Sequence, residues 1–183
     1  DALTERGIEY VPNQQVAELD TRNSEARFKS GISISYDLFV GIPVHRVPHV
    51  VESCGLAVDG WVPVERSNLA TRFPGVYAVG DVTGLPMAKA GVFAEAAARV
   101  VADDIAARLR GDVTQQRYEG AGSCYIEFGG GLVGKVEANF FGGPTPTARL
   151  VAPSRELAAD KVAFASTRRE RWGSRSSTRP GSS

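Results

Sequence analysis

The clearest regular pattern of apolar and polar residues lies between residues 88 and 110. Apolar side chains recur there every three or four positions, among them Val92, Ala96 and Val100. This spacing places them on one face of an α-helix. Gly111 suits the position just after a helix end, where the backbone turns left-handed. The pattern therefore predicts one long helix with a single buried face.

Shorter apolar or alternating runs predict strands before and after this helix. The continuous apolar run at 36–42 is typical of a strand buried in a central sheet. Pro63 places the run at 60–64 on a sheet edge. Further strands are predicted at 8–11, 15–20, 27–29, 75–79, 118–128 and 132–140, and further helices at 50–54 and 154–171, the last with Ser154 as its N-cap.

Three glycines at and just after the junction of the last two predicted strands, Gly129, Gly131 and Gly134, formally match a dinucleotide-binding fingerprint. That fingerprint requires a strand before the glycines and a helix after them. The residues that follow, 135–140, instead alternate between polar and apolar like a strand. We therefore interpret the glycines as part of a hairpin turn.

Composition and charge exclude several classes of function. The 183 residues carry a formal net charge of zero, so nucleic acid is not an expected partner. Cys54 and Cys124 are widely separated and match neither a disulfide framework nor a zinc motif. No metal site is predicted, because Pro48 interrupts the helix that would be needed to pair His45 with His49.

The most informative candidate chemistry follows the predicted strand at 75–79. Gly80 and Asp81 come at its end, and Lys-Ala-Gly at 89–91 opens the long helix soon afterwards. A carboxylate at a strand end can accept hydrogen bonds from ribitol hydroxyls. The helix start offers free N–H groups and the positive end of the helix dipole. This arrangement predicts a flavin site, although Gly-Asp after a strand also occurs in ordinary turns.

Residues 37–111, which contain these motifs, resemble the pyridine-nucleotide–disulfide oxidoreductase superfamily. Within it, Lys-Ala-Gly-Val-Phe-Ala at 89–94 is similar to the branch of the sulfide:quinone oxidoreductases and flavocytochrome c sulfide dehydrogenases. The segment Gly-Ser-Cys-Tyr-Ile-Glu-Phe-Gly-Gly at 122–130 resembles the cysteine-bearing C-terminal strand of that branch. Together these segments extend the resemblance over most of residues 1–172.

The resemblance implies that the cofactor is FAD. Asp81, which follows Gly80, would bind the ribitol of the flavin. Lys89, Ala90 and Gly91 would lie near the pyrimidine end of the isoalloxazine, where a glycine allows close approach of the backbone. The dipole of the following helix would favour the anionic reduced flavin.

The resemblance also gives Cys124 a role, because this branch has a redox cysteine at that place. Its thiolate would attack sulfur beside the flavin, and the alternative is a buried structural cysteine in a hairpin strand. The sequence lacks the family's first glycine loop and the segment with its second cysteine, and Cys54 has no recognised role. We therefore expect this chain, read as a fragment that begins at Asp1 inside a longer reading frame, to bind FAD weakly and to be inactive alone.

The expected fold class is α/β: a partial FAD/NAD(P)-binding Rossmann-like sheet with one long helix, followed by a small α+β C-terminal domain. Residues 1–64 would be the end of a nucleotide-domain-like insertion, and 65–112 the C-terminal part of the FAD-binding domain. Residues 113–172 would form a hairpin-plus-helix domain. Residues 173–183, rich in Ser and Arg, are predicted to be a disordered tail.

The function implied by the resemblance is electron transfer from sulfide or another thiol, through FAD, to a quinone-type acceptor. One alternative is an NAD(P)H-dependent flavin reductase of the same superfamily. Another is a non-catalytic, truncated interaction module that pairs through an exposed sheet edge. The missing N-terminal FAD-binding half is an expected partner, and a homo-oligomer is compatible with the sequence.

The expected location is cytoplasmic, with peripheral contact at a membrane as an option. The cluster Arg168, Arg169, Arg171 and Trp172 could rest on anionic lipid near a quinone pool. A solvated helix end followed by a basic tail is the interpretation we favour for the same cluster.

Overall fold

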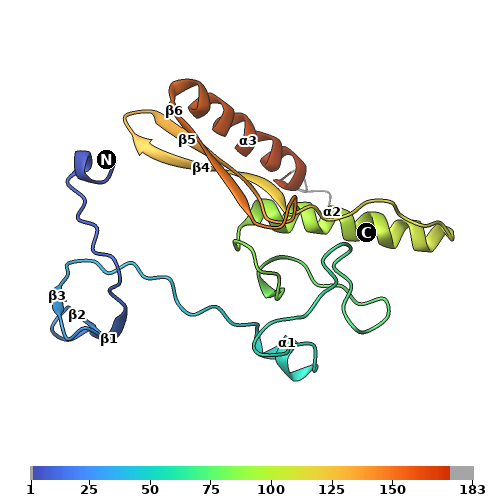
Figure 1. Ribbon diagram of the computed structural model, residues 1–183, viewed down its shortest axis with the longest axis horizontal. Coiled ribbons are helices and arrows are strands. Elements are labelled where there is room, and N and C mark those ends of the chain that lie inside the picture. The colour runs from blue at the N-terminus through green and yellow to red at the C-terminus, as the bar shows by residue number, and fades with distance from the viewer. Residues whose placement is uncertain (1, 174–183) are drawn as a thin grey trace, which may run out of the picture. The chain divides into compact units, whose positions relative to one another are not determined.

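The computed structural model describes residues 2–173. Contacts divide the chain into two compact units, residues 1–45 and residues 46–183. Each unit contains a small antiparallel sheet together with short or long helices (Figure 1). The mixed helix-and-sheet fold class expected from the sequence is confirmed. The predicted tail, apart from Gly173, lies outside the described residues.

The N-terminal unit contains a three-stranded antiparallel sheet with the strand order β1-β2-β3. The strands near 15–20 and 27–29 were predicted, whereas the third strand was not. A short 3-10 helix precedes the sheet and ends at Gly7, which has a left-handed backbone conformation. The elements are η1 (Thr4–Arg6), β1 (Val16–Asp20), β2 (Glu25–Phe28) and β3 (Ser33–Ser35).

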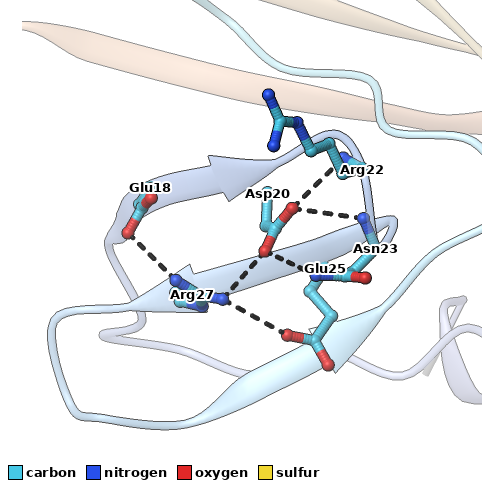
Figure 2. Close-up of polar contacts among 6 residues, drawn as sticks. All are labelled: Glu18, Asp20, Arg22, Asn23, Glu25 and Arg27. Atoms are coloured by element: carbon cyan, nitrogen blue, oxygen red, sulfur yellow. Dashed lines mark hydrogen bonds and ion pairs between the residues drawn. The ribbon is translucent and has the colours of Figure 1, made fainter.

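The carboxylate of Asp20 organises the turn between β1 and β2 (Figure 2). Its Oδ1 accepts hydrogen bonds from the backbone N–H groups of Arg22 and Asn23, both at 3.1 Å. Its Oδ2 accepts one from the Asn23 side chain at 2.9 Å and pairs with the Arg27 guanidinium at 2.9 Å. These interactions, chiefly those with Asn23, lower the pKa of Asp20. The ionised carboxylate therefore favours the folded hairpin.

Two strands predicted in this unit are wrong. Residues 8–11 and 36–42 form no strand, and Leu38, Val40 and Ile42 expose 80%, 85% and 88% of their surfaces. A strand needs a neighbour for its backbone hydrogen bonds, and within residues 2–173 no strand pairs with 36–42. The apolar run identified a segment suited to a sheet, but composition alone does not supply a pairing partner.

The C-terminal unit contains a second three-stranded antiparallel sheet with the order β4-β5-β6. The turn between β4 and β5 lies at 129–131, where the three glycines have φ values of 79°, 59° and 76°. The hairpin interpretation of the glycine motif is thus confirmed, whereas β6 was not predicted. The elements are α1 (His49–Ser53), η2 (Gly80–Val82), α2 (Gly91–Arg110), β4 (Ala121–Gly129), β5 (Leu132–Asn139), β6 (Thr147–Ser154) and α3 (Arg155–Gly173).

The long helix α2 is the element that the sequence predicted best. It ends at Gly111 in the left-handed conformation, as expected. Its buried face is rotated relative to the predicted one, with which it shares Val100. An alanine-rich helix has several apolar faces, and tertiary packing determines which of them is buried. The residues that are buried are Phe93, Ala97, Val100, Asp104 and Ala107, and Ala97 and Val100 join Leu69 and Tyr118 in the core.

The segment before α2 is extended, but the strands predicted at 60–64 and 75–79 do not form. They make only isolated bridges: Trp61 with Val58 and Val62 with Thr83 in the first segment, and Tyr77 with Ala70 in the second. Val62 is nevertheless almost fully buried. An apolar run is therefore buried here by side-chain packing and isolated bridges, without the continuous backbone hydrogen bonds of a β-sheet.

Tyr77 connects this extended segment to α2. Its hydroxyl donates a short hydrogen bond to Asp104, whose carboxylate also accepts one from Arg108 Nε at 2.9 Å. The hydrogen bond to the carboxylate, together with burial, raises the pKa of Tyr77. A buried carboxylate that accepts two hydrogen bonds has its hydrogen-bonding capacity met inside the protein. The contact therefore holds the extended segment that leads to Gly80 against α2.

β4 packs directly on the first turn of α2. A Cβ added at Gly122 would lie 2.7 Å from Phe93 Cε1, so only glycine permits this approach. The Phe93 ring also meets Phe140 edge-on, with 5.4 Å between ring centroids. Side chains two positions apart on a strand share a face. Cys124 therefore lies on the same face of β4 as Gly122.

The last helix, α3, begins where the sequence predicted. Ser154 Oγ accepts a hydrogen bond from the backbone N–H of Leu157 at 3.2 Å, which is the expected N-cap interaction. The helix runs along the β-sheet and packs mainly on β5 (Figure 1).

Acid should loosen the β1–β2 hairpin through Asp20. The pKa of this carboxyl in the folded chain lies below its ordinary value of 3.8. Its stabilising contribution is therefore fully present above that value and is lost as the pH falls through the lowered pKa. An NMR titration of the Asp20 carboxyl carbon should give a midpoint below 3.8. Asp20→Asn should remove the loss of hairpin stability that accompanies this titration. A midpoint at or above the ordinary pKa would contradict this account.

Substituting Gly122→Ala should destabilise the C-terminal unit by about 1–3 kcal/mol, the usual cost of overpacking a well-packed site. The new methyl group would displace either the Phe93 ring or the strand. Urea unfolding measures the loss. Gly143→Ala is the matched control, because its Cβ would meet no atom closer than 3.9 Å. Equal unfolding midpoints for the two variants would argue against the close contact.

Candidate functional site

Four residues predicted to bind cofactor line one small pocket: Gly80, Asp81, Lys89 and Ala90. Gly80 has a φ of 76°, and a Cβ there would lie 3.3 Å from the Cβ of Ala94 on α2. Glycine is therefore required both for the backbone conformation and for the approach to the helix. Asp81 is exposed beside it, so its carboxylate can accept hydrogen bonds from a ligand.

Lys89 holds the loop that closes this pocket. Its Nζ donates to the carbonyl oxygens of Thr83 at 2.5 Å and Leu85 at 3.4 Å, and it lies 4.7 Å from the centroid of the Trp61 ring. Burial lowers the pKa of Lys89, and the charge of Asp81 partly opposes this shift. Lys89 thus organises the loop while keeping a positive charge near Asp81.

The start of α2 is open to a ligand. Ala90 is the N-cap residue, and within the described chain no side chain caps this end of the helix. The first N–H groups of a helix have no partner inside the helix and carry its positive dipole end. Gly91 is exposed, and an added Cβ would meet nothing within 4 Å. The backbone at Gly91 can therefore be approached closely from outside.

A second, larger pocket of about 1090 Å³ joins Ala90 and Gly91 to Cys124. It is bounded by α2, β4 and α3, and its volume is that of a site for a substantial organic ligand. Much of the lining is apolar, including Val92 and Phe164. The structure therefore brings together residues that lie more than thirty positions apart in the sequence.

Cys124 reaches this pocket from the middle of β4, where it is half-buried. The neighbouring Tyr125 also lines the pocket, and its hydroxyl donates to Asp160 of α3 at 2.7 Å. Burial, and then this hydrogen bond, raise the pKa of Tyr125 to about 12. Tyr125 therefore stays neutral at physiological pH and fixes β4 against α3 next to the cysteine.

The end of α3 is solvated at Arg169 and Trp172, as interpreted from the sequence, but two of its arginines also form ion pairs. Arg168 and Arg171 both bind the carboxylate of Glu95 on α2, and all three residues line the larger pocket. Sequence reasoning missed Glu95. The spacing of Arg168 and Arg171 on one helix face was available as a signal, but nothing in the sequence named their partner.

Other candidate residues lie away from the site. Cys54 is exposed at the end of α1 and lines neither pocket. His49 opens the same helix. Nowhere in the described part of the chain do three or more His, Cys, Asp or Glu side chains gather as they would around a metal ion. Among residues 2–173, no helix is both long and apolar enough to cross a bilayer.

Comparison with known proteins places this chain in a family. The family model of the pyridine nucleotide-disulphide oxidoreductases matches residues 1–99. A mitochondrial sulfide:quinone oxidoreductase of Schizosaccharomyces pombe is 32% identical over 133 residues, which cover 69% of this chain and 29% of that protein.

Two solved structures share the fold. The sulfide:quinone oxidoreductase of Aquifex aeolicus superposes with a TM-score of 0.71 at 21% identity, covering 90% of this chain and 42% of that one. A chain in the mitochondrial ATP synthase of Tetrahymena thermophila gives a TM-score of 0.62 at 22% identity, covering 77% of this chain and 36% of that one. The chain thus spans well under half the length of these relatives.

The family expected from the sequence motifs is confirmed by these matches, and the chain is similar to sulfide:quinone oxidoreductases in both sequence and fold. The residues before α2 and its first two turns fall inside the matched region, whereas Cys124 lies beyond it. The chain belongs to the pyridine nucleotide-disulphide oxidoreductase family.

Proposed function

We propose that this chain forms part of an FAD-dependent oxidoreductase that moves electrons from sulfide or another thiol to a quinone-type acceptor. The observation that carries the proposal is the meeting of Gly91 and Cys124 in one pocket, next to a smaller pocket lined by Gly80 and Asp81. The similarity to a protein named sulfide:quinone oxidoreductase supports the choice of donor and acceptor.

The residues around the start of α2 fit a flavin. The exposed carboxylate of Asp81 would accept hydrogen bonds from the ribitol hydroxyls. The uncapped N–H groups after Ala90 would donate to electron-rich atoms of the flavin, and the open face at Gly91 would admit its ring. Lys89 would keep the loop before the helix in place. When bound, FAD would supply the two-electron redox chemistry that these side chains lack.

Cys124 would act on the donor side of the reaction. The thiolate is the reactive form of a cysteine, and a half-buried position on a pocket wall gives it access to small sulfur compounds. In the intact protein, a donor thiolate would attack a disulfide between Cys124 and a second cysteine that this chain does not supply. It would form a new S–S bond with one of the two cysteines and release the other as a thiolate. That thiolate carries the electron pair to be passed on.

The apolar lining of the larger pocket suits the acceptor. Phe164 and Trp172 of α3 and Val92 of α2 all line this pocket, whose space would receive a flat, apolar ring. Exclusion of water by such walls strengthens the polar interactions that remain inside.

The choice of electron donor is tested by anaerobic reduction of the flavin in the intact protein. Sulfide should bleach the flavin absorbance within one turnover, and addition of a short-chain quinone should restore it. NADH should leave the spectrum unchanged. Reduction by NADH but not by sulfide would instead favour the NAD(P)H-dependent reductase.

Asp81→Ala should lower the flavin occupancy of the purified intact protein by roughly tenfold, as expected for losing a charge-assisted hydrogen bond. Occupancy is measured as the ratio of flavin to protein absorbance. Asp103→Ala is the control, because Asp103 is an exposed carboxylate on α2 that lines neither pocket. Unchanged occupancy in Asp81→Ala would falsify the ribitol role.

Gly91→Ala should separate cofactor binding from folding. The added methyl group meets nothing in the protein, and alanine is favoured in helices over glycine by up to about 1 kcal/mol. Unfolding by urea should therefore be unchanged or shifted to higher concentration, while flavin occupancy falls because the open face is filled. Gly173→Ala, at the end of α3, has equally free space and should alter neither quantity. Full occupancy in Gly91→Ala would place the flavin elsewhere.

A further inference from the structure

α3 is attached to the rest of its unit by side-chain tethers rather than by burial. None of its residues, 155–173, is buried. Near its middle, Asp160 accepts hydrogen bonds from Tyr125 at 2.7 Å and Lys135 at 3.4 Å. Phe164 adds an edge-on contact with the ring of Tyr125, at 5.2 Å between centroids. A helix held in this way can shift at one end while its other end stays fixed.

The C-terminal end of α3 is tied to α2 through one carboxylate. Glu95 pairs with Arg168 at 2.9 Å and with Arg171 at 2.5 Å, both from α3. It also pairs with Arg99, one turn further along α2, at 2.6 Å. The Glu95 side chain is only 13% exposed, whereas Arg168 and Arg171 are 32% and 47% exposed. The carboxylate therefore lies at the surface of α2, largely covered, and the arginines reach it from the more exposed helix.

Glu95 is held in its ionised form by the arginines around it. Burial by itself raises the pKa of this carboxyl, but the hydrogen bond from Arg99 and the charges of Arg168, Arg99 and Arg171 outweigh burial, so the pKa is lowered overall. Arg168 also stacks on the Phe164 ring, at 3.5 Å from its centroid. This stacking directs its guanidinium toward α2.

These ion pairs lie at the pocket that contains Cys124. Glu95, Arg168 and Arg171 line it together with the cysteine, as does Trp172 of the same helical turn. The tethers near Asp160 hold α3 on the sheet, whereas the pairs to Glu95 hold it over the helix side of the pocket.

We propose that Glu95 is a positioning residue that latches the C-terminal end of α3 over the pocket of Cys124, so that release of Arg168 and Arg171 opens this pocket to solutes. The inference deepens the proposed function, on which its relevance to catalysis rests. The latch itself is a property of the protein and does not depend on the cofactor. Ion pairs between partly exposed side chains are modest in strength and are screened by salt. The latch is therefore reversible and responds to ionic strength.

The rate at which N-ethylmaleimide modifies Cys124 tests the latch in the full chain carrying Cys54→Ser. This reagent is neutral, so its approach is insensitive to local charge. Glu95→Gln and the double variant Arg168→Gln/Arg171→Gln should each raise the rate about two- to tenfold, as expected for losing one or two partly exposed ion pairs. Combining all three substitutions should add nothing further. Added sodium chloride should speed the modification of the parent but not of Glu95→Gln.

Arg99→Gln is the matched control. It removes a partner of the same carboxylate but leaves both links to α3, so its rate should equal that of the parent. The two latch variants also exclude a simple electrostatic effect on the thiol. Loss of the carboxylate and loss of the arginines change the charge around the thiol in opposite directions, whereas release of the latch accelerates the modification in both variants. Rates that move in opposite directions, or that stay at the parental value in low and high salt, would overturn the proposal.

Failure of the latch is distinguishable from failure of the proposed function. The thiol measurement needs no flavin, donor or acceptor, whereas the sulfide and NADH reductions test the electron-transfer activity directly. Far-UV circular dichroism of each variant verifies that the helices remain. Should Glu95→Gln fail to fold, the salt dependence of the parent and the rate of the arginine double variant decide the question.

Discussion

The site depends on the close packing of β4 against the first turn of α2. Gly122 lets the strand approach Phe93 at a distance that no other residue allows. The same turn of α2 carries Gly91 and its uncapped N–H groups, and the same face of β4 carries Cys124. One steric contact therefore determines whether the predicted cysteine and the predicted cofactor residues share a pocket. Without it, the two motifs would belong to separate elements with no chemical relation.

Charge around the site is arranged as a few anchored carboxylates with several cations near them. Asp81 has Lys89 close by, although the lysine is hydrogen-bonded to the loop rather than to the carboxylate. Glu95 holds arginines from two helices. In both places the cation binds the backbone or another helix, and only the larger pocket, which Glu95 lines together with Arg99, Lys161, Arg168 and Arg171, has an excess of positive charge. Such an environment favours anionic ligands in the larger pocket.

The sequence predicted well those features that depend on local chemistry. The period of α2, its stop at Gly111 and the glycine turn between β4 and β5 follow from backbone preferences that neighbouring residues hardly change. The candidate residues around Asp81 also come from a local motif, a Gly-Asp pair before a glycine-containing helix start, and their cofactor role stays a prediction. The strands predicted at 36–42 and 75–79 were wrong, since apolar composition does not show whether another strand lies alongside.

The sequence by itself thus determined the helix, the hairpin, the cofactor motif and the family. Tertiary structure alone decided that the first residues of α2 face Cys124, that the buried stripe of α2 runs through Phe93 and Ala97, and that the arginines of α3 end on Glu95. The physical reason is the range of the forces involved. Backbone conformation and capping act within a few residues, whereas steric fit and ion pairing join side chains that only the completed fold brings within reach.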